Sequence, residues 1–386
     1  MLSSLYRRPG GPVGAACRLV AVGDIMLSGG VGRRHPPGKD AARLFGDTVP
    51  LLRMGDIVFG NLETPLCDDS SRRDLFRGDL GMAGTLADAG FNVLSLANNH
   101  ILDYGPGGLR QCMEALRRCG VSVLGAGLNQ TEARRPVVVE RRGVRVGLIG
   151  FGRTLQRQAD PGLPGFAEWD EREALEAVRT LRSKVECVVV SLHIGMMWID
   201  YPNPAFKDIG DGLIDAGADV VLMHHAHVLQ GYGVRAGRLA IYNLGNFIAD
   251  IDEGETESTP VPERQRESGV FVIDLDREGV VEAGLIPLWI TDAFSVSVAD
   301  TERAQRIQNR LERISEDIRL DRYHKEYARQ RAELNTGNLI ESLLVKIRRR
   351  RWGDLAKSLL RLRPEHLGMF GRFGARKLGA LLKRQS

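Results

Sequence analysis

Short apolar segments alternate with helix-like segments through much of this chain. Apolar runs that predict strands occupy residues 18–22, 56–59, 91–96, 187–192 and 218–223. Segments that predict helices lie between them, at residues 41–53, 81–89, 106–119, 170–184 and 205–216. Strands that alternate with helices favour a mainly parallel sheet. We therefore predict an α/β protein, in which two late strands, at 269–275 and 281–290, suit a second sheet packed on the first.

Polar residues that can bind metals follow several of these predicted strands. They are Asp24, Asn61, Glu63, Asn99, His100, His193, His225 and His227. The strands of an α/β fold end at a common edge, where the connecting loops assemble sites. A single His is most often a polar residue with a satisfied hydrogen bond, but residues 224–227 contain three. Carboxylate, amide and imidazole groups without a thiolate suit divalent cations, so we expect one or two ions of Mn, Fe, Zn or Mg.

Composition restricts the cellular compartment in which such a protein can function. Of its 386 residues, 43% are hydrophobic and 26% charged, a balance typical of globular proteins. No segment is apolar for long enough to span a bilayer, and Arg7 and Arg8 precede no apolar core of a signal peptide. The five cysteines are scattered without a Cys-x-x-Cys pair, which indicates a reducing compartment. We therefore expect a cytoplasmic protein.

Charge is divided unevenly along the chain. Residues 341–386 contain 13 Lys and Arg against 3 Asp and Glu, a net charge of +10, whereas residues 1–340 carry 40 against 46, a net charge of −6. A basic tail favours an anionic partner, such as an acidic polymer, nucleic acid or the cytoplasmic face of the membrane. The alternative is a solvated helical face. One long exposed helix is predicted over 303–331, shorter basic helices over 338–386, and a mobile acidic loop over 251–267.

The order of these motifs resembles that of the calcineurin-like metallophosphoesterases. It is most similar to the CapA-type branch, which is associated with poly-gamma-glutamate capsule synthesis. The matching segments are Gly23-Asp24-Ile25-Met26, Gly60-Asn61-Leu62-Glu63-Thr64-Pro65-Leu66, Ala97-Asn98-Asn99-His100 with Asp103 and Gly105, Leu192-His193-Ile194-Gly195, His225-Ala226-His227-Val228 and Tyr242-Asn243-Leu244-Gly245-Asn246-Phe247. The resemblance covers about residues 18–290. It implies a four-layer α/β/β/α sandwich. We place this domain at residues 16–298 and, from the charge and helical pattern, a charged, basic helical extension at 299–386.

The resemblance also implies a metal-binding role for each candidate ligand. Asp24 and His227 would bind one metal. Asn99, His193 and His225 would bind the other. Two ions a few ångströms apart can bind a phosphoryl group and lower the pKa of a water between them.

Other matched positions supply the general acid, the bridging ligand and the supporting groups. His100 aligns with the general acid of the family. The phosphoesterases usually have Gly-Asp where this chain has Gly60-Asn61, so we expect the nearby Glu63 to be a ligand and Asn61 its neutral partner. For His224, the alternatives are a metal ligand, a hydrogen-bond partner of a ligand or a surface residue. We expect His224 to be a bystander that does not bind the metal. Groups expected to orient ligands or line the pocket are Asn98, Asp103 and Asn246, the last with a simple turn residue as the alternative.

Departures from the family pattern leave more than one function open. Phosphoesterases normally have Asp-x-His after the first strand, whereas this chain has Asp24-Ile25-Met26. Ile194 and Ala226 stand where the capsule proteins usually have Trp and Pro. We expect a metal-dependent hydrolase of a phosphoester or amide bond in an anionic polymer or phosphorylated substrate. The alternative is a non-catalytic assembly factor that binds metal, polymer or a capsule synthase. A nuclease ranks last, because no aromatic platform for bases lies beside the site.

Overall fold

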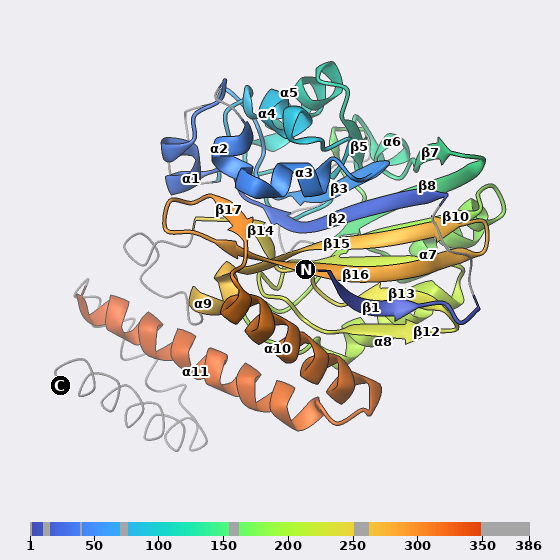
Figure 1. Ribbon diagram of the computed structural model, residues 1–386. Helices are drawn as coiled ribbons and strands as arrows, with labels where there is room; N and C mark the ends of the chain where they lie inside the picture. Colours follow the sequence, from blue (N-terminus) through green and yellow to red (C-terminus); the bar gives the residue numbers. More distant parts are fainter. Residues whose placement is uncertain are drawn as a thin grey trace. The chain divides into compact units, whose positions relative to one another are not determined.

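Two β-sheets packed face to face form the centre of the structure (Figure 1). The computed structural model describes residues 2–10, 16–38, 41–69, 76–153, 162–250 and 262–348. The strands of the first sheet are β1 (Ser3–Arg7), β2 (Cys17–Ile25), β3 (Ile57–Leu62), β4 (Val93–Ser95), β5 (Ser122–Leu124), β14 (Asn246–Ile248), β15 (Glu267–Asp276), β16 (Gly279–Ile290) and β17 (Val296–Val298). Their order is β1-β16-β15-β2-β3-β4-β5, with β14 beside β2 and β17 beside β16.

The second sheet is parallel at its centre and antiparallel at both edges. Its strands, in the order β12-β13-β11-β10-β8-β7, are β7 (Val137–Arg141), β8 (Val144–Gly152), β10 (Cys187–His193), β11 (Val220–His224), β12 (Tyr232–Arg235) and β13 (Arg238–Ile241). The parallel strands β8, β10, β11 and β13 end at the same edge. A separate pair consists of β6 (Ala126–Gly127) and β9 (Gly165–Phe166).

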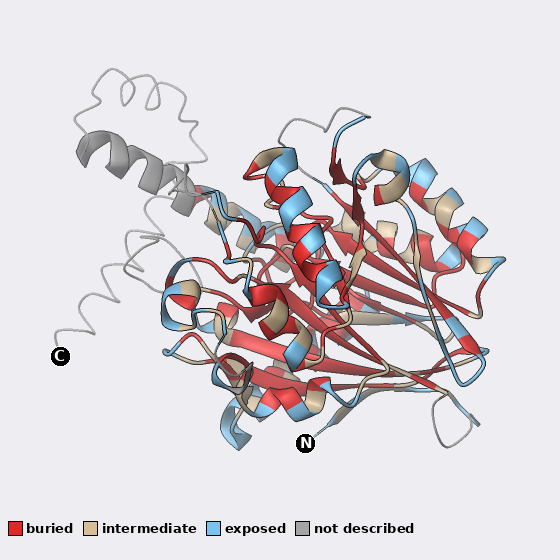
Figure 2. Ribbon diagram, turned by 90° about the horizontal axis from the view of Figure 1, so that it is seen from above, coloured by how far each residue is buried: buried red, intermediate tan, exposed pale blue. Residues whose placement is uncertain are grey.

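Alternate residues of the strands pack on opposite sides of each sheet. In β2, Leu19 and Ala21 lie in the apolar cluster between the two sheets, whereas Val20 and Val22 lie in the cluster beneath the helices. Figure 2 shows buried residues along the strands and exposed residues on the outer sides of the helices. Burial on both faces explains why these strands appear in the sequence as continuous apolar runs.

Helices cover the outer faces of both sheets. On the first sheet lie α2 (Ala41–Phe45), α3 (Val49–Leu52), α4 (Met82–Ala89) and α5 (Gly105–Arg118). On the second lie α7 (Glu171–Arg182) and α8 (Pro204–Asp215). The other described helices are α1 (Gly29–Arg34), α6 (Gln130–Ala133), α9 (Pro262–Arg266), α10 (Thr301–Arg319) and α11 (His324–Arg348). The arrangement is the predicted four-layer α/β/β/α sandwich, which is therefore confirmed (Figure 1).

The assignment of strands to sheets differs from the prediction in one respect. The late strands β15 and β16 do not form the second sheet, because β15 pairs antiparallel with β2, where Phe271 stands opposite Ala21. The second sheet comes instead from the middle of the chain. The sequence also gave no sign of β1, which pairs antiparallel with β16 although its residues are only partly buried.

The single exposed helix predicted over 303–331 is wrong. Two helices replace it, α10 and α11, and Asp321 between them has a left-handed φ of 54°. Helix α10 is not exposed on all sides, because Ile307, Leu311 and Ile318 are buried. These residues recur at helical spacing and form one apolar face, which the many charges of the segment obscure.

The chain divides into two compact units. They comprise Met1–Asp252 with Val261–Arg322, and Glu253–Pro260 with Tyr323–Ser386. Both sheets and α10 belong to the first, and α11 belongs to the second. The domain boundary predicted at residue 298 stays a prediction, and most of the predicted basic helices and acidic loop lie outside the described residues. Among the described helices, none combines the length and apolarity needed to cross a membrane.

Candidate metal centre

The strand ends bring the candidate metal ligands of both sheets together. Asp24, near the end of β2, pairs with Asn61 of β3 on one side and with Asn246 of β14 on the other. In the second sheet, the last residue of β10, His193, pairs with the last residue of β11, His224. The ligands thus lie at the carboxyl ends of neighbouring strands, where loops commonly build sites in α/β folds.

Two overlapping groups of side chains could each hold a cation. One consists of Glu63, His193 and His225, and the other of Asp24, Glu63 and His227. Within each group the ligand atoms lie within 4.8 Å of one another. Glu63 belongs to both groups, so its carboxylate lies between the other donors of the two groups.

The surroundings of Glu63 are unusual for a buried carboxylate. Its side chain is fully buried, and neither oxygen has a hydrogen-bond partner among the described residues. The nearest ring nitrogens are Nε2 of His193, 3.4 Å from Oε1, and Nε2 of His227, 3.8 Å from Oε1. A buried charge without hydrogen bonds is costly, and a bound cation would compensate it.

Asparagine side chains surround these groups and fix their orientation. Asn99 Oδ1 lies 2.8 Å from His193 Nε2, so it sits beside the group of Glu63, His193 and His225. Asn61 Nδ2 donates to Asp24 Oδ1 at 2.8 Å. Further contacts are those of Asn98 Nδ2 with Asn61 Oδ1 (3.3 Å) and with the Leu62 carbonyl oxygen (2.8 Å), and of Asn246 Oδ1 with His227 Nδ1 (3.0 Å).

His224 is not a bystander. It is fully buried, and its Nδ1 lies 3.1 Å from Asp24 Oδ1, so it is neither a surface residue nor a member of the two ligand groups. Val220 and Leu222 of the same strand point between the sheets, and His224 continues that alternation. The period-two pattern could have predicted this inward orientation.

His100 stands at the edge of the cluster. Its Nδ1 lies 3.0 Å from Asp103 Oδ2, and its backbone N–H donates to Asn98 Oδ1 at 3.2 Å. The ring of Phe76 meets it edge-on with 4.4 Å between ring centroids. The His100 side chain is 21% exposed, so it is held by a carboxylate on one side and remains accessible to solvent. Sequence reasoning did not identify Phe76, because no local pattern relates it to His100.

The backbone around the histidines is strained. His225 and His227 have left-handed φ angles of 91° and 57°, and Trp198 has a φ of 64°. These sites are linked, because the Trp198 N–H donates to the carbonyl oxygen of Ala226 at 2.8 Å. Each such conformation costs about 1–3 kcal/mol and tends to persist where function requires it. The left-handed backbone lets His225 and His227, which are separated by a single residue, face the same cluster.

Charges around the cluster control its protonation. Burial disfavours the ionised carboxylate of Asp24, but hydrogen bonds with two histidines outweigh burial and hold its pKa well below the usual value. Burial would lower the pKa of His227, but Glu63 and Asp24 raise it to about 9. Burial and the neighbouring His193 lower the pKa of His225 to about 3. The raised pKa of His227 favours its protonated form between the two carboxylates, and the lowered pKa of His225 favours its neutral form, whose Nδ1 lies 3.1 Å from His193 Nε2.

Met26 stands where a phosphoesterase would have a further imidazole. Its side chain packs against Ala249 and Ile290 and is absent from both candidate ligand groups. The group of Asp24, Glu63 and His227 is therefore the poorer in imidazole, with one ring against two in the other group.

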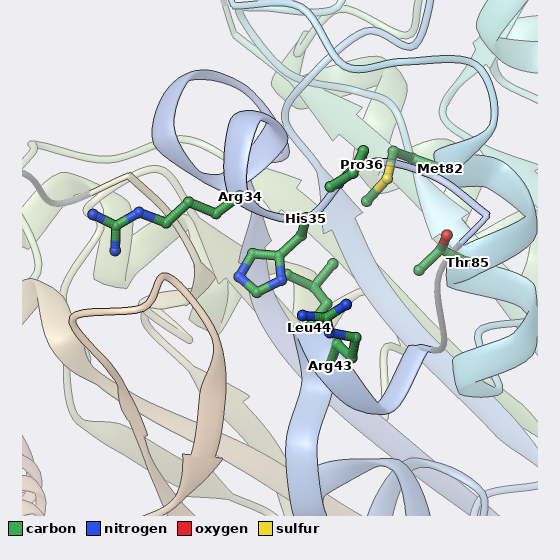
Figure 3. A pocket seen from close by; sticks show the side chains of 7 residues that line it. All are labelled: Arg34, His35, Pro36, Arg43, Leu44, Met82 and Thr85. Atoms are coloured by element: carbon green, nitrogen blue, oxygen red, sulfur yellow. The ribbon is translucent and has the colours of Figure 1, made fainter.

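A small pocket lies at α1, α2 and α4, and its chemistry differs from that of the histidine cluster (Figure 3). Its lining residues are Arg34, His35, Pro36, Arg43, Leu44, Met82 and Thr85. Arg34 Nη1 donates to the carbonyl oxygen of Asp292 at 2.5 Å, and His35 Nε2 lies 2.8 Å from that of Ala293. The lining contains no carboxylate, so it does not resemble the candidate metal-binding cluster.

Known proteins resemble this chain over most of its length. The family described as "Bacterial capsule synthesis protein PGA_cap" matches residues 18–251. The PGA biosynthesis protein CapA of Bacillus subtilis (strain 168) is 27% identical over 293 residues, which cover 74% of each chain. The capsule biosynthesis protein CapA of Bacillus anthracis is 28% identical over 76% of this chain and 72% of the relative. A probable polyglutamine synthesis accessory protein of Mycobacterium tuberculosis (strain CDC 1551 / Oshkosh) is 26% identical over 76% of this chain and 82% of its own. The chain therefore belongs to the family of bacterial capsule synthesis proteins, PGA_cap.

Proposed function

We propose that this protein is a metal-dependent hydrolase that cleaves a phosphoester or amide bond during the synthesis of a capsule or polyglutamate polymer. The observation that carries the proposal is the fully buried Glu63 carboxylate, which has no hydrogen-bond partner among the described residues and is shared by two groups of ligands. Such a carboxylate is best satisfied by cations on both sides.

The donor groups fit two divalent ions. Asp24, Glu63 and His227 would hold one, and Glu63, His193 and His225 would hold the other. Asn99 lies beside the second set and offers an amide oxygen. Oxygen and imidazole donors without thiolate suit Mn, Fe, Zn or Mg. The left-handed backbone at His225 and His227 supports this assignment, because strain of this kind is typical of functional sites.

The residues around the cluster have complementary chemical roles. Bound divalent cations would supply Lewis-acid activation of a water and of the scissile group. His100 would give a proton to the leaving group, and Asp103, whose Oδ2 lies 3.0 Å from His100 Nδ1, would fix the orientation of the ring. Asn61 and His224 hold Asp24 in place through its Oδ1 atom.

The names of the relatives suggest the class of substrate. They describe PGA, polyglutamine and capsule synthesis, and so point to a polymer of glutamate or glutamine. We propose the same class for this chain. The basic segment 341–386 would then hold the acidic polymer or the cytoplasmic face of the membrane. Binding of the full chain to polyglutamate and to anionic vesicles tests this role of the basic segment, and we expect binding to at least one of them that weakens with added salt. Failure to bind either one at low salt would contradict the role.

Hydrolysis of two model substrates tests the enzymatic proposal. The full chain, loaded with Mn²⁺, is incubated with bis-p-nitrophenyl phosphate and with a γ-linked glutamate oligomer. We expect the wild type to hydrolyse at least one of the two substrates. The turnover rate of His100→Gln should be about 100- to 10,000-fold lower, with unchanged metal content. His35→Gln is the matched control, because His35 contacts the Ala293 carbonyl oxygen rather than the cluster. Wild-type turnover in His100→Gln would exclude His100 as the acid.

A non-catalytic assembly factor is the second candidate. Met26 gives the protein one imidazole fewer than a phosphoesterase, and one relative is named an accessory protein. Such a factor would bind polymer or a capsule synthase without turnover. Metal-loaded protein that binds polyglutamate but cleaves neither model substrate would favour this candidate.

A further inference from the structure

Arg310, on α10, connects three segments that are distant in sequence. Its side chain is only 12% exposed. Nη1 of its guanidinium donates to the Leu229 carbonyl oxygen at 3.1 Å and to Asp200 Oδ1 at 3.5 Å. Nη2 donates to Glu267 Oε2. A planar guanidinium can hold several acceptors at fixed angles, so this one side chain fixes three points together.

Two of these three points are close along the chain to a candidate metal ligand. Asp200 lies in the loop that leaves β10 after His193, and Leu229 follows soon after His227. Glu267 begins β15. Movement of Asp200 or of Leu229 would therefore move a loop that carries a candidate metal ligand, whereas Glu267 ties the same guanidinium to the first sheet.

The two histidine loops are also joined directly to each other. Gln230 Nε2 donates to the carbonyl oxygens of Ile199 at 2.8 Å and Tyr201 at 3.2 Å. The Trp198 N–H donates to the Ala226 carbonyl oxygen at 2.8 Å. The loops thus form one unit, and Arg310 attaches that unit to α10.

This unit contains the strained backbone of the site. His225, His227 and Trp198 all have left-handed φ angles. Strained conformations persist only where the surrounding structure holds them, so the site needs a clamp outside the strained residues themselves. The contacts of Arg310 with Asp200 and the Leu229 carbonyl oxygen, on either side of this unit, meet that need.

Helix α10 packs too closely on the loop to move independently of it. A Cβ on Gly231 would lie 2.8 Å from Ile318 Cδ1 and 3.0 Å from the backbone nitrogen of Ser315, so only glycine permits this approach. Ser315 Oγ accepts a hydrogen bond from the Tyr232 N–H at 3.0 Å. The position of the helix is therefore transmitted to the loop after His227.

From these contacts we propose that α10 is part of the metal centre and that Arg310 is a positioning residue for His193, His225 and His227. The inference rests on the proposed function, because the loops matter through the ligands they carry. Helix α10, at Thr301–Arg319, lies beyond residues 18–251, which the family match covers. The clamp therefore adds to the site a part that the matched segment does not contain.

Arg310→Lys tests the clamp without removing its charge. Lysine keeps the positive charge opposite the buried Asp200 and Glu267 but cannot span both with a planar fork. Arg319→Lys is the matched control, because Arg319 is on the same helix, its side chain is 66% exposed, and Glu316 is its only ion-pair partner among the described residues. All proteins are full chains, and far-UV circular dichroism checks that each is folded.

The first readout is metal binding, with Co²⁺ and Mn²⁺ as probes. We expect Arg310→Lys to bind Mn²⁺ about 10- to 100-fold more weakly and to change the Co²⁺ absorption spectrum, as loss of a supporting contact does in metal sites. Arg319→Lys should match the wild type in both. Equal affinity and an equal spectrum in all three proteins would overturn the clamp.

The second readout, hydrogen–deuterium exchange, does not depend on metal. Without metal, Arg310→Lys should speed exchange of residues 194–203 and 225–231, and Arg319→Lys should not. In the wild type, Mn²⁺ should slow exchange in α10 as well as in these loops, because coupling acts in both directions. Unchanged loop exchange in Arg310→Lys would overturn the clamp. If that variant does not fold, unchanged α10 exchange on adding Mn²⁺ to the wild type would do so. A wild type that binds neither metal would instead contradict the proposed function.

Discussion

Gly152→Ala should damage the metal centre by separating two backbone segments. Gly152 ends β8 and pairs with His193, and a Cβ there would lie 2.4 Å from the Ala97 carbonyl oxygen and 3.1 Å from the Asn98 nitrogen. These are backbone atoms, which cannot rotate away. Restoring ordinary contact requires a separation of about 1 Å between β8 and the turn that carries Asn99 and His100.

The size of the effect follows from this displacement. Overpacking of this kind costs about 1–3 kcal/mol of unfolding free energy. At roughly 2 °C per kcal/mol for a domain of this size, the melting temperature should fall by about 2–6 °C. A shift of about 1 Å also exceeds the tolerance of about 0.2 Å for metal–ligand distances, so Asn99 should no longer support a cation.

Thermal unfolding and a Co²⁺ titration measure the two consequences. Gly84→Ala is the matched control, because Gly84 lies inside α4 and a Cβ there would meet nothing within 4 Å. It should raise stability by up to about 1 kcal/mol, since alanine favours a helix over glycine. A Gly152→Ala protein with the melting temperature and Co²⁺ spectrum of the wild type would refute the reasoning.

Three further predictions concern His224 and His227, which both contact Asp24. His224→Leu removes the contact with Asp24 Oδ1 and should weaken Mn²⁺ binding about 10- to 100-fold. His224→Asn can keep a nitrogen near the Nδ1 position and should bind Mn²⁺ almost normally. Equal Mn²⁺ affinity of the two variants would contradict the role of His224. Because the pKa of His227 is raised to about 9, a metal must displace its proton, so apparent Mn²⁺ affinity should rise by up to about tenfold per pH unit between pH 6.5 and 9 and then level off. The same raised pKa predicts that, without metal, the stability contributed by this group is complete below about pH 6.5 and is lost as the pH rises through 9, which thermal unfolding across that range can check.

The strand pattern was sufficient to predict an α/β fold and the sheet edge at which the candidate ligands meet, whereas the four layers were expected from the family resemblance. Buried strands appear as apolar runs, and parallel strands end at one edge, so the polar residues that follow them were expected to meet. The structure brings together Asp24, Glu63, His193, His225 and His227 at that edge. Their roles as ligands remain predictions. The inward orientation of His224 was also accessible, since it continues the alternation of β11.

Features that depend on distant contacts could not be predicted. The left-handed backbone at Trp198 has no sequence signature, because tertiary contacts hold it. Arg310 belongs to a segment that the sequence suggested was an exposed helix, yet its acceptors Asp200 and Glu267 lie 110 and 43 residues away. Pairing over such separations leaves no local pattern, so the docking of α10 became visible only in three dimensions.

Metal content of the purified protein tests the central claim most directly. Wild type, Glu63→Gln and His225→Ala are loaded with Mn²⁺, passed through a desalting column and measured by inductively coupled plasma mass spectrometry. The shared position of Glu63 predicts that Glu63→Gln loses both ions, whereas His225→Ala loses only the ion of its own group. Wild-type metal content in Glu63→Gln would contradict the account, because a bridging carboxylate could not then be what holds the two ions.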